Sequence, residues 1–564
     1  MKRISGFILL CLIIFPARSG GEELYEAGLN KGIRNADAYS YVLIEQSREK
    51  KAEALTLLKR ALTYSPDLPA VYFELAKASF SFSASGTLDS IDYILQGINA
   101  YSRNFLWSFV IAGSLFLSLI LSFICAIAII IAIRLFSDTP LLAHDVRENR
   151  ARAFLLLGLI VLSIISPFLF LLGLLVLLGL YMKKIDRVVV YLFCLFLFLS
   201  PLVFQTASLF FNTLSSAKVK AIISVNESKE NNYALTVLGT SDDYAALFSH
   251  ALALKREGFY GQAIAGYKTL LEKSQDPRVY VNLGNCYVGL YNFEEAKKYN
   301  LAEAMKYYLA AAGIKPLASE YYNLSQISRE MLDFTKGDEY FRSALALDRV
   351  AVAEYRAVAG RNPNRIAVDE TLTFSDLWDY VRARPGEISL FGMTAFSPLV
   401  LSLLSFLLLA SFFVLDRSLR QRAYRCRKCN TILCALCEKR LMWGQMCPSC
   451  YGSLIKLDEL DVRERVARLL SIYELQRKRR DTMKILSFIL PGSSQIYAGK
   501  VLYGFVFLWP FLFFLSIPLV NSLFVTESTF FSHDFLNYSA LFIAAIVYGF
   551  SNLITRRRIA RGWL

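Results

Sequence analysis

Apolar and polar residues alternate along this chain in long blocks. Hydrophobic residues dominate six runs, which lie at 105–133, 153–181, 188–211, 392–415, 500–525 and 538–554. A helix needs about 20 apolar residues to cross the hydrocarbon of a bilayer, so most of these runs predict membrane helices. We therefore predict an all-α protein in which a multi-span membrane region alternates with water-soluble helical segments. The expected divisions are 1–19, 20–104, 105–211, 212–390, 391–415, 416–483 and 484–564.

The apolar run at 153–181 has two interpretations. It is long enough for one tilted span, but Ser166-Pro167 near its middle also suits the turn of a hairpin or re-entrant segment, because proline removes a helical hydrogen bond. The choice decides the topology. A single span would place the 212–390 segment in the cytoplasm and the 416–483 segment outside.

Composition and charge favour the hairpin. With 55% hydrophobic and 19% charged residues, the chain is too apolar for an ordinary soluble protein and too polar for membrane helices alone. Its net charge of +15 is unevenly distributed: residues 416–484 contain 17 Lys and Arg against 8 Asp and Glu, whereas residues 212–390 contain 21 against 22. Basic segments remain on the cytoplasmic side of membrane proteins. We therefore expect a bacterial inner-membrane protein whose segments 20–104 and 212–390 are periplasmic and whose 416–483 segment and C-terminus are cytoplasmic.

The first 19 residues are typical of an export signal. Lys2 and Arg3 precede an apolar stretch at 4–15, and Ala17 and Ser19 are small residues at the spacing that a signal peptidase accepts. The alternative is an uncleaved membrane anchor. With either alternative, the chain after residue 20 is expected to begin outside the cytoplasm.

The polar segment 212–390 contains an internal period. Small residues at Ala251, Gly284 and Ser325 are each followed by further small and aromatic residues at similar distances, and the second interval is longer by an eight-residue insertion. The remaining landmarks are Leu254, Ala263, Tyr267, Leu270, Pro277, Tyr287, Ala296, Ala304, Tyr308, Ala311, Pro316, Leu324, Gly337, Phe341 and Ala344.

This pattern resembles the tetratricopeptide repeat, a helix-turn-helix unit of about 34 residues in which small residues let paired helices approach closely. The resemblance implies a curved stack of helix pairs whose inner groove, formed mainly by the first helix of each pair, binds a peptide or a partner protein. Segment 20–104 has a weaker version of the pattern at Ala54, Leu58, Ala61 and Pro66, followed by Tyr72, Leu75 and Ala76. Because so few repeats cannot bury a continuous core, we expect this segment to pack against the 212–390 segment or a partner.

Six of the ten cysteines form three C-x-x-C pairs between residues 426 and 450. The outer pairs, Cys426/Cys429 and Cys447/Cys450, have the spacing of a zinc ribbon, so these four residues are the expected ligands of a structural zinc ion. The middle pair, Cys434 and Cys437, has three interpretations: it completes a site with another chain, forms a redox pair, or replaces one outer pair. Reduced thiolates suit the cytoplasmic side, and the outer segments contain only Cys286.

Basic residues flank the cysteine module on both sides. Arg417, Arg420, Arg422, Arg425, Arg427 and Lys428 lie in or before it, and Arg477, Lys478, Arg479 and Arg480 end a helix expected at about 458–480. Beside a membrane such clusters typically contact acidic lipid headgroups, and we regard nucleic-acid binding as the weaker alternative.

The segment from Pro491 to Lys500, P-G-S-S-Q-I-Y-A-G-K, resembles the P-G-x-G-[QH]-x-Y-x-G motif of small bacterial two-span membrane domains. Ser494 replaces the second glycine of that motif, so the chain departs from the motif at a position where glycine permits a close backbone approach. The resemblance covers about 70 residues and implies no particular chemistry.

The sequence gives little support for an enzyme. His144, His250 and His533 are the three histidines, none with a convincing nucleophile or metal partner, and the apolar runs lack the ionisable residues that a pump needs. We predict a non-enzymatic scaffold or adaptor in the inner membrane that binds a protein or peptide through its repeats. The alternatives are a transmembrane sensor that couples repeat occupancy to the zinc module and an auxiliary subunit of a secretion or transport complex. The oligomeric state stays open.

Overall fold

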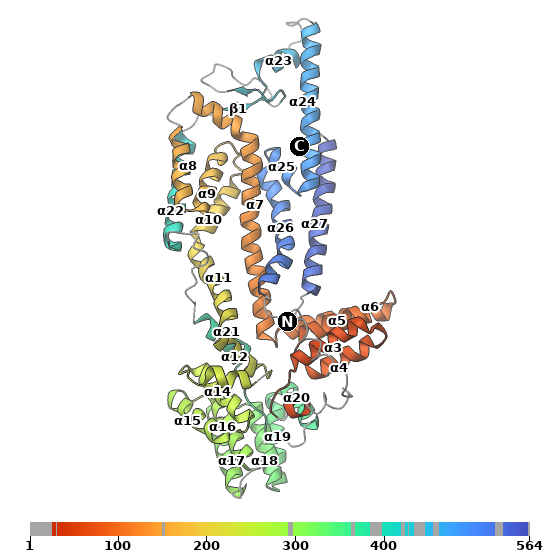
Figure 1. Cartoon of the computed structure of the whole chain (residues 1–564), viewed down its shortest axis with the longest axis vertical. Helices are drawn as coiled ribbons and strands as arrows, with labels where there is room; N and C mark the ends of the chain where they lie inside the picture. Colours follow the sequence, from red (N-terminus) through yellow and green to blue (C-terminus); the bar gives the residue numbers. More distant parts are fainter. Residues whose placement is uncertain are drawn as a thin grey trace, which may run out of the picture. The chain divides into compact units, whose positions relative to one another are not determined.

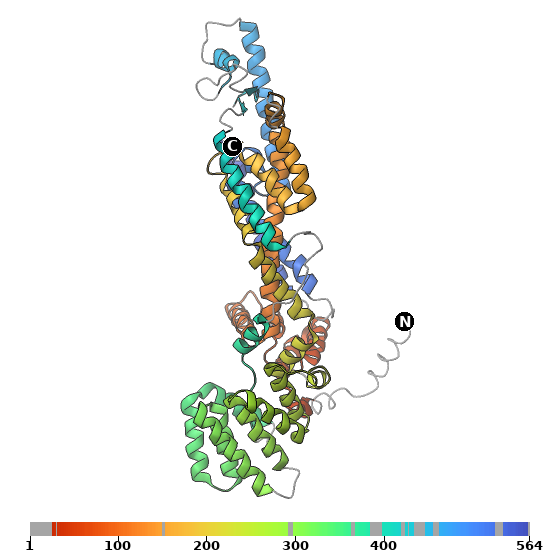
Figure 2. The same cartoon turned by 90° about the vertical axis from the view of Figure 1, so that its left-hand side faces the viewer.

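The computed structural model describes the chain as two compact, almost entirely helical units (Figures 1 and 2). Unit 1 comprises Met1–Val110, Phe211–Pro385 and Thr529–Phe531, and unit 2 comprises Ile111–Phe210, Gly386–Ser528 and Ser532–Leu564. The residues described are 25–29, 31–148, 153–229, 231–291, 297–361, 367–383, 397–418, 423–426, 428–433, 446–454, 462–524 and 534–561. The expected signal peptide, Ala296, Cys434, Cys437 and His533 lie outside the described residues.

The N-terminal part of unit 1 consists of short helices packed in pairs. Its elements are α3 (Asp37–Glu49), the 3-10 turn η1 (Lys51–Glu53), α4 (Ala54–Tyr64), α5 (Pro69–Ser79) and α6 (Ala84–Tyr101). Leu58, Ala61 and Leu75, three of the residues that suggested a weak repeat, are buried between these helices.

This N-terminal part packs against the remainder of unit 1. The backbone N–H of Arg34 donates to the Ser228 carbonyl at 2.8 Å, and the Asn35 side-chain amide donates to the Glu227 carbonyl at 2.9 Å. An ion pair joins Lys31 to Glu257 at 2.5 Å. The expected packing of the two polar segments on each other is therefore confirmed.

The remainder of unit 1 is a series of helix pairs, which Figure 1 shows stacked in chain order from α14 to α19. The helices are α12 (Ala217–Asn226), α13 (Asn232–Leu238), α14 (Tyr244–Arg256), α15 (Tyr260–Lys273), α16 (Pro277–Tyr291), α17 (Lys297–Ile314), α18 (Ala318–Glu330), α19 (Phe334–Leu347), α20 (Arg349–Arg361) and α21 (Phe374–Arg382). The helix pairs α14–α15, α16–α17 and α18–α19 coincide with the three units of the sequence period. Helix α17 has 18 residues where α15 and α19 have 14, so part of the eight-residue insertion lengthens this helix.

Small residues let these helices approach closely, as the pattern predicts. Ala263, Ala304 and Ala344 have no exposed surface, and the rings of Tyr267 and Tyr308 are also fully buried. A Cβ atom at Gly284 would lie 2.6 Å from the Tyr308 ring, so α16 and α17 could not pack this way with a larger residue there.

Unit 2 includes the longest and most apolar helices of the described chain. Its principal helices are α7 (Phe105–Glu148), α8 (Ala153–Ile165), α9 (Pro167–Gly179), α10 (Val188–Phe198), α11 (Ser200–Ser215), α22 (Pro398–Ser418), α24 (Val462–Ile489), α25 (Ser493–Tyr497), α26 (Val501–Phe524) and α27 (Asp534–Ala560), with α7 and α11 continuing into unit 1. A small hairpin of β1 (Tyr424–Arg425) and β2 (Ile432–Leu433), with Tyr424 opposite Leu433, and the short α23 (Pro448–Leu454) form the cysteine module.

Four helices in the described part of the chain are long and apolar enough to cross a membrane, which indicates a membrane protein. They are Phe105–His144, Pro398–Arg417, Val501–Ser522 and Phe535–Ala560. The run at 188–211, expected to form a membrane helix, is instead broken into α10 and α11, which are bent by 59°. Pro201 at the start of α11 has no backbone N–H, so it cannot extend the hydrogen-bond ladder of α10.

The ambiguous run at 153–181 forms two short helices, α8 and α9, that fold back on each other. Pro167 occupies the first position of α9, and the Ser166 hydroxyl caps this helix by accepting from the N–H of Phe168. Gly173 lies against Leu159 and Leu162 of α8. Each helix has 13 residues and is therefore about 20 Å long, shorter than the hydrocarbon of a bilayer.

Helix α7 extends beyond the apolar run at 105–133. Residues 105–133 are apolar, but the helix continues beyond them and its candidate span includes Arg134 and Asp138, which form a buried ion pair. Arg134 also donates to the Ile496 carbonyl at 3.4 Å. The pair therefore ties α7 to the α25 region rather than lying isolated in apolar surroundings.

The P-G-S-S-Q-I-Y-A-G segment forms a tight turn and the short helix α25. Gly492 and Gly499 adopt left-handed backbone conformations, and a Cβ atom at Gly492 would lie 2.2 Å from the Gly504 carbonyl oxygen. The close backbone approach thus occurs between Gly492 and Gly504, whereas Ser494 is buried and donates to the Met483 carbonyl. Helix α24 runs to Ile489, nine residues beyond the expected end, because no helix-breaking residue precedes Pro491.

Candidate functional sites

Residues 367–372, the resident segment, run in an extended conformation along helices α12, α14, α16 and α18 of unit 1. The Asn323 side chain of α18 accepts from the Val368 N–H at 2.7 Å and donates to the Val368 carbonyl at 2.9 Å. Both backbone groups of one residue are thus held by a single side-chain amide. This two-way pairing substitutes for a neighbouring β-strand.

The same arrangement recurs two residues later. The Asn282 side chain of α16 accepts from the Glu370 N–H and donates to its carbonyl, both at 2.9 Å. Asn226, in α12, accepts from the Leu372 N–H at 2.7 Å. These contacts hold every second residue of the segment by its backbone, as expected for an extended strand.

Asp369, between the two clamped residues, is held by its side chain. Its carboxylate accepts from Lys255 at 2.5 Å and Arg256 at 3.4 Å, both in α14, and from the Asn285 amide at 2.8 Å. The Asp369 carboxylate is 2% exposed. A buried carboxylate requires such compensation, so this position demands a negative charge.

We call the residues of these helices that hold the resident segment the segment-binding surface. They are Asn226, Lys255, Arg256, Asn282, Asn285 and Asn323. Two of the asparagines are themselves held by buried neighbours: the Tyr308 hydroxyl donates to the side-chain oxygen of Asn285 at 2.5 Å, and the Asn226 amide donates to the Ser249 hydroxyl at 2.8 Å. The surface is therefore preorganised by buried hydrogen bonds.

One acidic group beside the resident segment is less well satisfied. Glu320, in α18, is fully buried, and its hydrogen bond with the backbone of Leu317 offsets only part of the effect of burial. Burial, together with the nearby Glu370, raises the pKa of Glu320 to about 7. Burial also raises the pKa of Glu370. The hydrogen bond that the Ser319 hydroxyl donates to Glu370 lowers this pKa, but burial has the larger effect.

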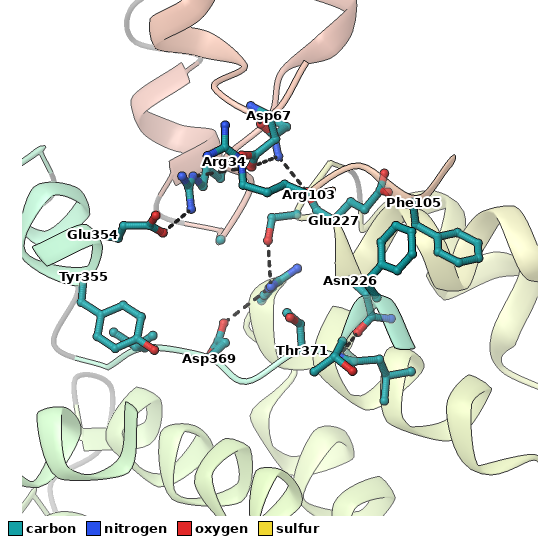
Figure 3. A pocket seen from close by; sticks show the side chains of 18 of the residues that line it. Arg34, Asp67, Arg103, Phe105, Asn226, Glu227, Glu354, Tyr355, Asp369 and Thr371 are labelled. Atoms are coloured by element: carbon teal, nitrogen blue, oxygen red, sulfur yellow. Dashed lines mark hydrogen bonds and ion pairs between the residues drawn. The ribbon is translucent and has the colours of Figure 1, made fainter. Parts of the chain in front are cut away.

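A cavity of about 350 Å³ adjoins the resident segment. Figure 3 shows Asp369 and Thr371 at its edge, Glu354 and Tyr355 of α20 on another side, and Arg34, Asp67 and Arg103 of the N-terminal part above. Arg34 pairs with Glu354 at 3.4 Å, and Arg103 pairs with Asp67 at 3.0 Å. The resident segment therefore has polar space beside it within unit 1.

Sequence analysis expected a peptide-binding groove but did not identify these residues or the resident segment. A signal was present, because Asn282 and Asn323 each stand two residues before a landmark, Gly284 and Ser325, in the first helix of a pair. What it could not reveal is that the bound segment comes from the same chain.

The second candidate site is the cysteine module of unit 2. Cys426 follows β1 and Cys429 lies in the turn before β2, where Asn430 adopts a left-handed conformation. Cys447 precedes α23 and Cys450 lies in its first turn. All four sulfur atoms lie within 4.8 Å of one another, and those of Cys429 and Cys447 are 3.6 Å apart. The structure therefore brings the four predicted ligands together.

The local hydrogen bonds favour thiolates at this cluster. The N–H of Cys447 donates to the Cys426 sulfur and the N–H of Cys450 donates to the Cys447 sulfur, both at 3.3 Å. Burial raises the pKa of Cys426, but backbone N–H groups around it outweigh burial and lower the pKa to about 6. Burial and the neighbouring Cys429 raise the pKa of Cys447 and Cys450. Four adjacent thiols therefore cannot all ionise unless a cation balances them.

The cluster fits a tetrahedral metal ion. Sulfur atoms about 2.3 Å from a central zinc would be about 3.8 Å apart, close to the separation of Cys429 and Cys447. Four thiolates and no carboxylate or carbonyl oxygen favour a soft or borderline ion. Because all four positions are protein ligands, the site suits structural stabilisation rather than catalysis.

The cysteine module is attached to neighbouring helices of unit 2. Arg425 donates to the Ser137 carbonyl of α7, and Gln476 of α24 donates to the Lys428 carbonyl at 3.0 Å. Ile472 of α24 packs against the buried cysteines. A change in the metal site would therefore act directly on α7 and α24.

Comparison with known proteins adds no assignment. No protein-family model matches the sequence, and no curated protein is significantly similar to it.

Proposed function

We propose that this protein is a membrane-anchored scaffold or adaptor that binds an extended, acidic segment of a partner protein on the segment-binding surface, in exchange for its own resident segment. The observation that carries the proposal is the two-way pairing of Asn282 and Asn323 with the backbone of Glu370 and Val368. Contacts of this kind recognise any extended backbone. The Lys255 and Arg256 pair adds selectivity for a carboxylate between the two clamped residues.

We further propose that α14–α19 are tetratricopeptide-type repeats. The small residues Ala251, Gly284 and Ser325 occupy equivalent places in α14, α16 and α18, and the clamping asparagines lie in the first helices. This is the helix that the resemblance assigns to ligand binding. The charge distribution supports a periplasmic position for unit 1, and the four thiolates support a structural zinc ion in a cytoplasmic module.

A peptide-binding measurement tests the proposal. The probe is a fluorescent peptide with the sequence of residues 365–374, RIAVDETLTF, added to the full chain in lipid nanodiscs. In the wild-type chain the resident segment competes at an effective concentration in the millimolar range, so binding should be weak. Asp369→Asn weakens the resident segment, and we expect this variant to bind the peptide at least about tenfold more tightly.

Two controls make the result specific. A peptide with asparagine at the place of Asp369 should not bind the Asp369→Asn chain, because the charges of Lys255 and Arg256 would stay unpaired. Adding Asn282→Ala to the Asp369→Asn chain should remove binding of the wild-type peptide, while circular dichroism confirms that the helices remain. Absence of binding to the Asp369→Asn chain at millimolar peptide would refute the proposal.

One observation favours the transmembrane sensor as a second candidate. The resident segment continues through Thr373 into α21, whose Phe374 and Trp378 contact the beginning of α7: the Phe374 and Phe105 rings lie 5.1 Å apart, and the Trp378 and Phe109 rings 5.6 Å. Exchange of the segment would disturb these contacts. If the protein is a sensor, hydrogen exchange in α24 should change when the peptide binds the Asp369→Asn chain. If it is a scaffold only, exchange in α24 should stay constant.

A further inference from the structure

Helix α6 exposes its large apolar residues and buries its small ones. Leu88, Ile91, Leu95 and Ile98 are between 48% and 66% exposed, and their spacing places them on one side of the helix. This order is the reverse of that in a helix of a soluble domain, where large apolar residues face the core. We call these four residues the α6 apolar stripe.

The buried side of α6 explains why the stripe faces outward. Gly86, Ser90, Gly97 and Ala100 are the buried residues, and they pack toward the preceding helix. A Cβ atom at Gly97 would lie 3.1 Å from the ring of Phe73 in α5. The close contact between α5 and α6 therefore depends on small residues, and the large ones cannot be turned inward without breaking it.

A third side of α6 is polar. Asp89, Asp92, Gln96 and Asn99 are exposed, and the Gln96 amide donates to the Asp92 carboxylate at 2.7 Å. The helix thus has a buried side of small residues, an apolar stripe and an acidic polar side. A helix that presents an apolar side and a polar side at once is suited to the boundary between lipid and water.

The position of α6 in the chain indicates which surface covers the stripe. Three residues, Ser102–Asn104, separate α6 from α7, whose Phe105–His144 segment is a candidate membrane span. This connection is fixed: Arg103 pairs with Asp67 at 3.0 Å, and the Asn104 side chain accepts from the Trp107 N–H at 3.2 Å. The stripe is therefore held beside the end of a membrane helix.

We propose that the α6 apolar stripe lies on the surface of the bilayer that α7 enters, with its side chains among the outer ends of the acyl chains. Asp89 and Asp92 make an anionic headgroup surface unfavourable, so the partner is a zwitterionic lipid such as phosphatidylcholine or phosphatidylethanolamine. The contact is independent of the segment-binding surface. It holds unit 1 against the membrane whether or not a partner segment is bound.

Adjacent tryptophan substitutions test this proposal in the full chain. Leu95→Trp lies in the stripe and Gln96→Trp on the polar side, and both positions are exposed, so neither substitution disturbs the core. Each chain is reconstituted into phosphatidylcholine vesicles with and without bromine on the acyl chains, and the emission of the parent chain is subtracted. We expect brominated lipid to reduce the added emission of Leu95→Trp at least about twofold, and aqueous acrylamide to quench Gln96→Trp instead.

Ile91→Trp, one turn earlier in the stripe, should behave as Leu95→Trp does. Quenching of both stripe variants by acrylamide and not by brominated lipid would show that the stripe is in water and would overturn the proposal. Protection of both from the two quenchers would show that protein covers the stripe, a partner or a second copy of this chain, and would overturn it equally.

Discussion

Units 1 and 2 each contain a set of converging buried polar side chains, and the two sets differ in what they hold. The segment-binding surface of unit 1 holds residues 367–372 of the same chain, and the charges of Lys255 and Arg256 are balanced by Asp369. The cysteine cluster of unit 2 brings four sulfur atoms within 4.8 Å of one another, a donor set that could hold a metal ion. The first set is completed by the chain itself, whereas the second has the composition of a site for an external ion.

The difference indicates different roles. A set of side chains that the chain itself completes exchanges its occupant only for a segment that outcompetes the tethered one, which suits regulated binding. A cluster that is incomplete without an ion gains the whole binding free energy of that ion on folding, which suits permanent stabilisation.

The largest expected effect is the loss of the metal. Cys447→Ser removes one ligand, and because a structural zinc ion contributes on the order of 10 kcal/mol, we expect the module to lose both metal and fold. Elemental analysis of the purified chain should find one zinc ion per wild-type chain and almost none in the variant. Cys434→Ser is the matched control. If this variant keeps its metal, Cys434 is not a ligand. A Cys447→Ser chain that keeps its metal would contradict the proposed ligand set.

A smaller effect is expected where the chain supplies its own ligand. Asn323→Ala leaves the N–H of Val368 without its partner, at a cost of about 1–3 kcal/mol, whereas the Val368 carbonyl keeps its hydrogen bond from the Asn285 amide at 2.8 Å. Hydrogen exchange at residues 367–372 should therefore accelerate at least about tenfold, while the fold of unit 1 persists. Asn99→Ala, at an exposed position of α6, should leave this exchange unchanged. Unaltered exchange in the Asn323→Ala chain would show that the clamp does not hold the segment.

The smallest expected effect concerns Glu320, the less satisfied group beside the resident segment. Its pKa is raised from 4.5 to about 7, so between these values the folded chain binds more protons than the unfolded chain. The contribution of Glu320 to stability is therefore present below pH 4.5 and is lost as the pH rises to about 7. Glu320→Gln should remove this dependence and stabilise unit 1 by about 1–2 kcal/mol at pH 8, with little effect at pH 4.5.

Hydrogen exchange in α16 and α18 at the two pH values measures this difference. Glu339→Gln, exposed on α19, is the control and should change neither value. Equal stability of the Glu320→Gln and wild-type chains at pH 8 would show that the Glu320 carboxylate has a further partner in solution.

Local patterns of the sequence predicted much of the architecture. The period through Ala251, Gly284 and Ser325 predicted helix pairs that the structure contains, because close packing of two helices demands small residues at fixed intervals. The apolar runs predicted four helices with the length and composition of spans. The prediction of one straight membrane helix over 188–211 was wrong, because the run is broken into two helices. Pro201 was a signal of this break in the sequence.

The spacing of the outer C-x-x-C pairs was sufficient to select the four cysteines that the fold brings together, because each pair is a local turn and only two turns had to meet. The segment-binding surface had a weaker signature, the place of Asn282 and Asn323 two residues before Gly284 and Ser325, which does not reveal what these side chains hold. Its contacts join Val368 to Asn323 and Glu370 to Asn282, residues 45 and 88 positions apart.

The sequence by itself thus determined the helical class, the apolar helices, the paired helices of unit 1 and the four-cysteine cluster, since each depends on residue types at short, regular spacings. Only the tertiary structure decided that residues 367–372 occupy the segment-binding surface and that α6 turns its large apolar residues outward. Both depend on which surfaces remain available after the helices have packed. Packing is set by contacts between distant residues, and no local pattern encodes those contacts.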